Sequence, residues 1–230
     1  MVYTYSYLLL DVFYGLIWFA LFAWKKHCRR EMVIISLPFG ILGLALNWLY
    51  VQDWWYPLTI TGTIPAIEDF LYGFFLGGIA AVIAESFRSK ELTYTLLEKH
   101  KRMKRLRFFW VATLASIVMF YFTYFLLHIN TFWISLFITF FVLGCIYYKR
   151  PDLLNHSLRA GFFLVIVNVV AYSIVNFLTP GWVEAFWYFK FFPKLIILNV
   201  PLEDIFFYFA FGAAVGPLYE YWQEGRLRKK

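Results

Sequence analysis

Long, continuously apolar stretches dominate this sequence, and clusters of basic residues separate them. A helix needs roughly 20 residues to cross a hydrocarbon core about 30 Å thick, and several of these stretches reach that length. Hydrophobic residues make up 62% of the chain and charged residues only 15%, a balance that excludes a soluble domain. A transmembrane β-barrel is excluded too, because its strands alternate polar and apolar residues. The sequence therefore predicts an all-α integral membrane protein.

Seven transmembrane helices are predicted. They cover approximately residues 3–24, 33–51, 65–87, 108–127, 131–148, 160–178 and 201–222. The first stretch lacks the basic start and small-residue cleavage site of a signal peptide, so we expect it to be retained as a helix. The polar segment 88–107 is rich in Lys and Arg, and we expect it to be solvated or to face anionic lipid.

The basic residues predict the orientation in the cell membrane. Of the 21 Lys and Arg residues, 19 follow the first, third, fifth or seventh helix, and only Lys190 and Lys194 lie on the other side. Cytoplasmic loops carry the excess of Lys and Arg, so we expect the N-terminus outside and the C-terminus in the cytoplasm. Membrane topology thus explains the net charge of +7, and no nucleic-acid partner is expected. Cys28 and Cys145 would lie toward the reducing side, and they form neither a disulfide framework nor a metal-binding spacing.

Two adjacent acidic pairs stand at the start of apolar stretches. Glu68 and Asp69 lie in PAIED, and Glu203 and Asp204 lie in PLED. Proline and acidic residues are favourable in the first turn of any helix, so capping is one explanation for each pair. Charged residues in membrane segments are costly, however, and usually functional. The duplication, with several aromatic residues after each pair, favours a functional site.

The acidic pairs belong to an internal repeat. Each three-helix unit has a helix, a basic loop, a helix with Asn near its outer end (Asn47 or Asn176), an aromatic loop and a proline-led helix. One helix separates the units, so they are predicted to be parallel repeats related by a pseudo-twofold axis along the membrane normal. That axis would bring the acidic pairs together. The predicted domains are residues 1–87 (first three-helix repeat), 88–130 (basic loop and linker helix) and 131–230 (second three-helix repeat and basic tail).

Carboxyl groups in an aromatic, apolar site can perform acid chemistry on a hydrocarbon. Burial and a second nearby carboxylate favour the protonated form, whereas a helix N-terminus favours the ionised form. If burial and repulsion prevail, the acid can protonate a hydrocarbon, and aromatic rings can stabilise the resulting carbocation. A carboxylate can then remove a proton, and no metal is needed. The candidate catalytic residues are Glu203, Asp204, Glu68 and Asp69. The candidate substrate-binding residues are Phe70, Tyr72, Phe206, Phe207, Tyr208, Asp11, Asn47 and Asn176, although Asp11 could instead make a structural hydrogen bond.

The duplicated proline–acid motif with its following aromatics, on seven predicted helices split three-one-three, resembles the membrane-integral lycopene cyclase family. The members occur in bacteria, archaea and fungi, and their halves are separate or fused in tandem. The resemblance extends over essentially the whole chain. PLED matches the motif directly, whereas PAIED has one extra residue between the proline and the acids, which leaves the orientation of Glu68 and Asp69 open.

This resemblance implies a lycopene β-cyclase. Such an enzyme closes the ends of lycopene, or of a related linear carotenoid in the membrane lipid, to β-ionone rings and forms γ-carotene or β-carotene. The reaction is redox-neutral and proton-initiated. We expect no cofactor, and no Gly-rich phosphate-binding motif indicates a flavin.

Three other classes of membrane protein fit less well. A retinal protein would need a lysine in the last helix, which the sequence lacks. A Glu-Glu intramembrane protease would need a nearby arginine and histidines within helices, but no arginine follows Asp69 before Arg88, and we expect His128 and His156 to lie at loops. A proton-coupled transporter or a lipid- or isoprenoid-binding protein remains an alternative, because acidic residues can relay protons through a membrane. The many aromatic residues and few other polar ones favour a hydrocarbon site.

The two connections before the acidic pairs are rich in Trp and Tyr. Such residues usually form a belt at the membrane interface, although they could also roof a hydrophobic cavity. The residues concerned are Trp54, Trp55, Tyr56, Trp182, Trp187 and Tyr188.

Overall fold

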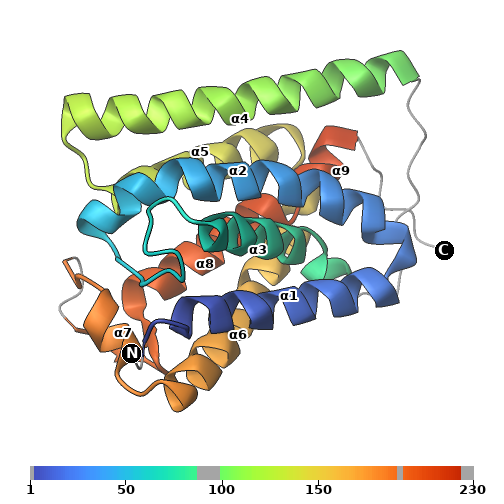
Figure 1. Ribbon diagram of the computed structural model, residues 1–230. Coiled ribbons are helices and arrows are strands. Elements are labelled where there is room, and N and C mark those ends of the chain that lie inside the picture. The colour runs from blue at the N-terminus through green and yellow to red at the C-terminus, as the bar shows by residue number, and fades with distance from the viewer. Residues whose placement is uncertain (1–2, 87–98, 191–193, 224–230) are drawn as a thin grey trace.

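Helices account for nearly all of the regular structure, because lipid offers no partner for a free backbone N–H or C=O group. The structure, a computed structural model, describes residues 3–86, 99–190 and 194–223 (Figure 1). The α-helices are α1 (Ser6–Trp24), α2 (Arg29–Asp53), α3 (Ile67–Ser86), α4 (Lys99–Leu127), α5 (Thr131–Lys149), α6 (Leu154–Leu178), α7 (Trp182–Phe186), α8 (Leu202–Val215) and α9 (Leu218–Gln223). Two single-turn 3₁₀ helices precede α2 and α6, namely η1 (Lys26–Cys28) and η2 (Pro151–Leu153). Strands β1 (Ile196–Ile197) and β2 (Val200–Pro201) pair in antiparallel fashion before α8.

In the described part of the chain, five helices are long and apolar enough to cross a membrane. They are Ser6–Trp24, Lys26–Asp53, Ile67–Ser86, Thr131–Lys149 and Pro151–Leu178. This finding confirms the predicted all-α membrane class. The predicted fourth and seventh spans are not among these five. Only Thr113–Leu127 of α4 is strongly apolar, and α8 ends after 14 residues, just before Pro217, which has no N–H group for a continuing helix.

Two helices that begin with acidic residues hold the bundle together. Helix α3 lies in the middle of the bundle in Figure 1 and packs against α1 and α2, whereas α8 packs against α5 and α6. Helix α3 also contacts α6, and α4 lies at the edge of the bundle beside α2 and α5.

Glycine allows α2 and α3 to come very close together. A Cβ atom on Gly43 would meet the backbone carbonyl oxygen of Asp69, and one on Gly73 would meet that of Phe39. Small residues permit such backbone approach between membrane helices. The contact at Gly43 also holds the first turn of α3, with its acidic pair, against α2.

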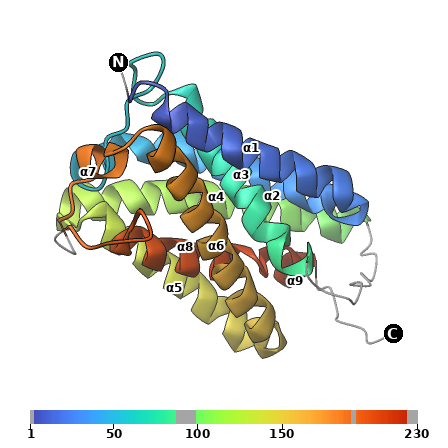
Figure 2. The ribbon, with the colours of Figure 1, turned by 90° about the horizontal axis from the view of Figure 1, so that it is seen from below.

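The two connections rich in Trp and Tyr, one before α3 and one before α8, meet at the end of the bundle where these helices begin. Trp55 and Trp187 pair as an isolated antiparallel bridge. The Tyr56 N–H donates to the Phe186 carbonyl over 3.0 Å, and the Tyr188 N–H donates to the Trp54 carbonyl over 3.1 Å. Figure 2 shows α7, which belongs to the second connection, at the same end of the bundle as the start of α1. The two connections thus form one joined structure over this end.

Candidate active site

The four acidic residues of the two pairs are buried in the first turns of α3 and α8. Glu68 is 0% exposed, Asp69 and Glu203 are each 1% exposed, and Asp204 is 4% exposed. Burying a carboxyl group is costly unless hydrogen bonds compensate it. The partners of each acid therefore indicate how it is held.

Asp69 accepts three hydrogen bonds. Its Oδ1 atom accepts one from the Tyr7 hydroxyl at 3.0 Å and one from Asn47 Nδ2 at 2.7 Å. Its Oδ2 atom accepts one from the Ala66 N–H at 2.7 Å, which is a helix-capping contact. Capping therefore explains one of the three bonds, and the other two come from α1 and α2.

Glu68 and Asp11 have fewer partners than Asp69. Glu68 Oε1 accepts from the Ile60 N–H at 2.7 Å, but Oε2 is buried and has no hydrogen-bond partner among the described residues. Asp11 on α1 is 1% exposed, and neither of its carboxyl oxygens is hydrogen-bonded within the described ranges. Asp11 also interacts electrostatically with both Glu68 and Asp69. Three carboxyl groups thus gather around the start of α3.

Asp204 accepts three hydrogen bonds from aromatic side chains. Its Oδ1 atom accepts from Trp54 Nε1 at 3.0 Å, and its Oδ2 atom accepts from Trp187 Nε1 at 3.1 Å and from the Tyr172 hydroxyl at 3.0 Å. These donors come from both aromatic connections and from α6. The connection after α2 therefore helps to hold the acid on α8.

A chain of tyrosine hydroxyl groups links α8 to α3. The Tyr208 hydroxyl oxygen lies 2.7 Å from that of Tyr172 and 2.5 Å from that of Tyr72. The Tyr14 ring lies 5.7 Å from the Tyr72 ring, and the Tyr14 hydroxyl donates to Asn168 on α6. The hydrogen bonds connect Asp204 to Tyr72 on α3, and the ring contact with Tyr14 continues the cluster to α1.

The predicted substrate-binding residues fall into two groups. Tyr72 and Tyr208 are in the hydroxyl chain, Asn47 binds Asp69, and the Phe207 ring lies 5.0 Å from the Trp54 ring. Asp11 lies beside the first acidic pair. The second group consists of Phe70, Phe206 and Asn176.

Phe70, Phe206 and Asn176 make other contacts. Phe70 stacks on Phe74 with 5.7 Å between ring centroids, and Phe206 is 50% exposed on the surface of the bundle. Asn176 Nδ2 donates to Asn199 Oδ1 at 3.1 Å.

Tyr172, rather than Asn176, is the residue of α6 that binds Asp204. Helices α2 and α6 have 25 residues each, and Asn47 and Tyr172 both lie 18 positions after the first residue. Each donates to the aspartate of the nearby pair, Asn47 to Asp69 and Tyr172 to Asp204. Asn176 lies one helical turn after Tyr172 and donates to Asn199 instead. Counting from the basic loops could have found Tyr172.

The indole partners of Asp204 were also missed. An interfacial belt is the wrong explanation for four of the tryptophans, because they are buried; they are Trp54, Trp55, Trp182 and Trp187. Tyr56 and Tyr188 remain partly exposed, at 38% and 40%. Trp54 and Trp187 donate to Asp204. A high Trp content in a connection does not by itself indicate that its indoles bind an acid.

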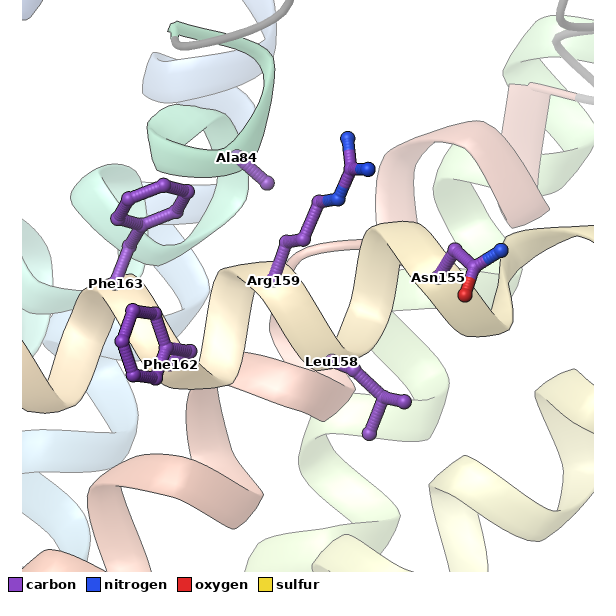
Figure 3. Close-up of a pocket in the computed structure, with 6 residues that line it drawn as sticks. All are labelled: Ala84, Asn155, Leu158, Arg159, Phe162 and Phe163. Atoms are coloured by element: carbon purple, nitrogen blue, oxygen red, sulfur yellow. The ribbon is translucent and has the colours of Figure 1, made fainter.

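A groove of about 430 Å³ lies near the last residue of α3, whereas Glu68 and Asp69 lie in its first turn; Figure 3 shows the residues that line the groove. Ala84, near the last residue of α3, lines one side, and α6 supplies Asn155, Leu158, Arg159, Phe162 and Phe163. Since the acids begin α3, this groove is separate from the candidate active site.

Comparison with protein families identifies the chain's relatives. The family model described as lycopene cyclase matches residues 2–87 and 128–222, which include both acidic pairs. No curated protein and no solved structure matches the chain. With most of its length matched by the family model, the chain belongs to the lycopene cyclase family.

Proposed function

We propose that this protein is a lycopene β-cyclase that closes one or both ends of lycopene to β-ionone rings inside the membrane. Family membership supports a carotenoid cyclase that acts on a linear carotenoid. The observation that carries the finer proposal is the burial of both acidic pairs among aromatic residues that link the two matched segments. Such a site combines proton donors with rings that can stabilise a carbocation.

The hydrogen bonds suggest different roles for the acids. Asp69 and Asp204 each accept three hydrogen bonds, an arrangement that stabilises a carboxylate. Glu68 Oε2 is buried and accepts no hydrogen bond in the described part of the chain, so this oxygen is available to carry the proton that is given to the substrate. We therefore assign proton donation to Glu68, supported by neighbouring Asp11, and assign proton removal and charge stabilisation to the aspartates. Glu203, at the matching place in PLED, is the corresponding donor of the second pair.

The proposed reaction is an isomerisation. A proton adds to the terminal double bond of lycopene and leaves a tertiary carbocation. The π electrons of a nearby double bond attack this cation and close a six-membered ring, which moves the positive charge. Loss of a proton to a carboxylate then forms the new double bond of the β-ionone ring. One proton enters and one leaves, so no electrons are exchanged with a redox partner.

We also propose the seven-helix repeat architecture for this enzyme. Helices α1 and α5 have 19 residues each, α2 and α6 have 25 each, and a single 3₁₀ turn precedes α2 and α6. Helix α3 packs on α1 and α2 as α8 packs on α5 and α6. These correspondences support parallel repeats in residues 1–87 and 131–230. The segment 88–130 would join them, with α4 and the α8–α9 pair completing seven spans.

A proton-coupled transporter is the rival proposal, and the acids' surroundings favour the cyclase. The partners of Asp204 are two indoles and a phenol, and the hydroxyl chain ends among further aromatic rings. These side chains offer an apolar surface rather than a hydrated path.

Production of cyclic carotenes in bacteria that accumulate lycopene tests the proposal. We expect γ-carotene or β-carotene with the unaltered chain. Glu68→Gln and Glu203→Gln keep the side-chain shape but remove the acid, so each is expected to lower ring formation at least ~100-fold. Unchanged lycopene in cells whose membranes contain the folded protein would overturn the proposal. Proton-coupled flux in liposomes without carotenoid conversion would favour the transporter.

A further inference from the structure

A second cluster of buried polar groups lies where α3 ends and α2 begins, far along α3 from the proposed active site. It contains a thiol, three carboxyl groups and an imidazole, and each of these residues is at most 7% exposed. The residues are Cys28, Glu31, Glu85, His156 and Glu220. The exposed His27 lies beside them in the same 3₁₀ turn as Cys28. The proposed cyclisation uses none of them.

Cys28 and Glu85 form the centre of this cluster. The Cys28 thiol donates to Glu85 Oε2 at 3.1 Å. The thiol also interacts electrostatically with Glu31 and Glu220. Ligand atoms of His27, Cys28 and Glu85 all lie within 4.8 Å of one another. Three residues with different ligand chemistries thus converge on one point.

The carboxyl groups around this point face one another. Glu85 interacts electrostatically with Glu220, and two carboxylates offer each other only hydrogen-bond acceptors. Glu85 Oε1 is buried and has no hydrogen-bond partner in the described ranges, and the same is true of Glu220 Oε2. The nearby His156 Nε2 lies 3.1 Å from Glu220 Oε1, so it can offset at most one negative charge. A cation between the carboxyl groups would satisfy the remaining oxygens.

We propose that His27, Cys28 and Glu85 bind a divalent transition-metal ion, with Glu220 as the fourth ligand. Zinc is bound by this combination of sulfur, nitrogen and oxygen ligands, usually in a four-coordinate site. A thiolate among the ligands favours zinc over magnesium or calcium. Binding releases the thiol proton and any carboxyl proton to solvent. The exposed side chain of His27 lets the ion enter from the surface.

The proposed site connects three parts of the chain. Cys28 precedes α2, Glu85 lies near the end of α3, and Glu220 lies on α9. A bound ion would therefore fasten α9, which follows the helix break at Pro217, to the first three helices. Its effect is structural and does not depend on the cyclase reaction.

Metal binding to the purified full-length protein in detergent tests this inference. We expect one Zn²⁺ per chain after dialysis, measured by elemental analysis, and a rise in the thermal unfolding temperature when Zn²⁺ is added to chelator-treated protein. Co²⁺ in place of Zn²⁺ should give a thiolate-to-cobalt charge-transfer band. Cys28→Ser should remove this band, and His27→Ala should weaken Co²⁺ binding at least ~10-fold, since loss of even an outer partner costs that much.

Matched variants distinguish the site from incidental binding. Cys145→Ser removes the other cysteine, which is exposed, and His128→Asn removes an exposed histidine; both should bind Co²⁺ like the unaltered chain. His27 lies on the surface, so His27→Ala keeps the test valid if Cys28→Ser does not fold. Absence of stoichiometric metal, or the same charge-transfer band in Cys28→Ser, would overturn the inference. Neither outcome bears on the cyclase proposal.

Discussion

Tyr72 on α3 and Tyr208 on α8 share a hydrogen bond, with 2.5 Å between their hydroxyl oxygens. The two residues are 136 positions apart, and each lies one turn after an acidic pair. Their contact joins the helices that carry the proposed catalytic acids. Through Tyr172 and Tyr208, Asp204 is thus linked by buried hydroxyl groups to the helix that carries the first acidic pair.

Removing these hydroxyl groups should destabilise the protein in proportion to the bonds lost. Tyr72→Phe loses one hydroxyl contact and Tyr208→Phe loses two. At about 1 kcal/mol per buried hydrogen bond, Tyr208→Phe should lower the free energy of unfolding more than Tyr72→Phe does. Thermal unfolding in detergent measures this, with the 58% exposed Tyr5 changed to Phe as a control. Equal stability of all three variants would show that the hydroxyl chain contributes nothing.

Asp204 should be essential for cyclisation, and each of the two indoles that donate to it should contribute to the cyclisation rate. Asp204→Asn removes the charge that three donors stabilise, so we expect cyclisation to fall at least ~100-fold. Trp54→Phe and Trp187→Phe each remove one hydrogen bond to a charged group, and each should cost roughly 10-fold.

Carotene yield per amount of membrane-inserted protein checks the Asp204 predictions. Trp24→Phe, at a side chain that is 62% exposed, is the matched control and should retain full activity. Loss of activity in Trp24→Phe as large as in Trp187→Phe would refute a specific role for the indole donors.

Asn47 and Asn176 should respond differently to substitution, although the repeat in the sequence makes them look alike. Asn47 donates to Asp69, whereas Asn176 donates to Asn199. Asn47→Ala should therefore lower cyclisation about 10-fold or more, because Asp69 loses a donor. Asn176→Ala should leave the product yield nearly unchanged. A strong loss in Asn176→Ala alone would reverse the proposed assignment.

Gly43 should not tolerate a side chain. Its Cβ would collide with the backbone of Asp69, so Gly43→Ala should cost about 1–3 kcal/mol of stability and displace the first acidic pair. Gly144→Ala is the control, since nothing lies within 4 Å of the added Cβ. Unfolding temperature and carotene yield should both fall for Gly43→Ala only. Normal values for Gly43→Ala would mean that α2 and α3 can separate at this point without cost.

The orientation can be tested with reporters fused after the last residue of this chain. Because 19 of the 21 basic residues lie on one side of the predicted topology, we expect the C-terminal side to face the cytoplasm. A fused green fluorescent protein should then fluoresce in bacteria, and a fused alkaline phosphatase should be inactive. Active phosphatase would invert the proposed topology.

The sequence alone determined the class of the protein and the location of its most unusual residues. Apolar stretches of membrane length must become helices, because lipid cannot satisfy backbone polar groups. Buried acids in such stretches are costly, so Glu68, Asp69, Glu203 and Asp204 could be singled out without a structure. The family resemblance rested on these acids, and the match to the lycopene cyclase family confirmed it.

The partners of the acids were decided only by tertiary structure. Trp54 and Trp187 are far apart in the chain, and they reach Asp204 because the two aromatic connections pair over one end of the bundle. Cys28 and Glu85, 57 positions apart, meet because α2 and α3 pack side by side. Composition and periodicity predict which face of a helix is apolar, but hydrogen bonds between distant side chains depend on how helices and loops pack.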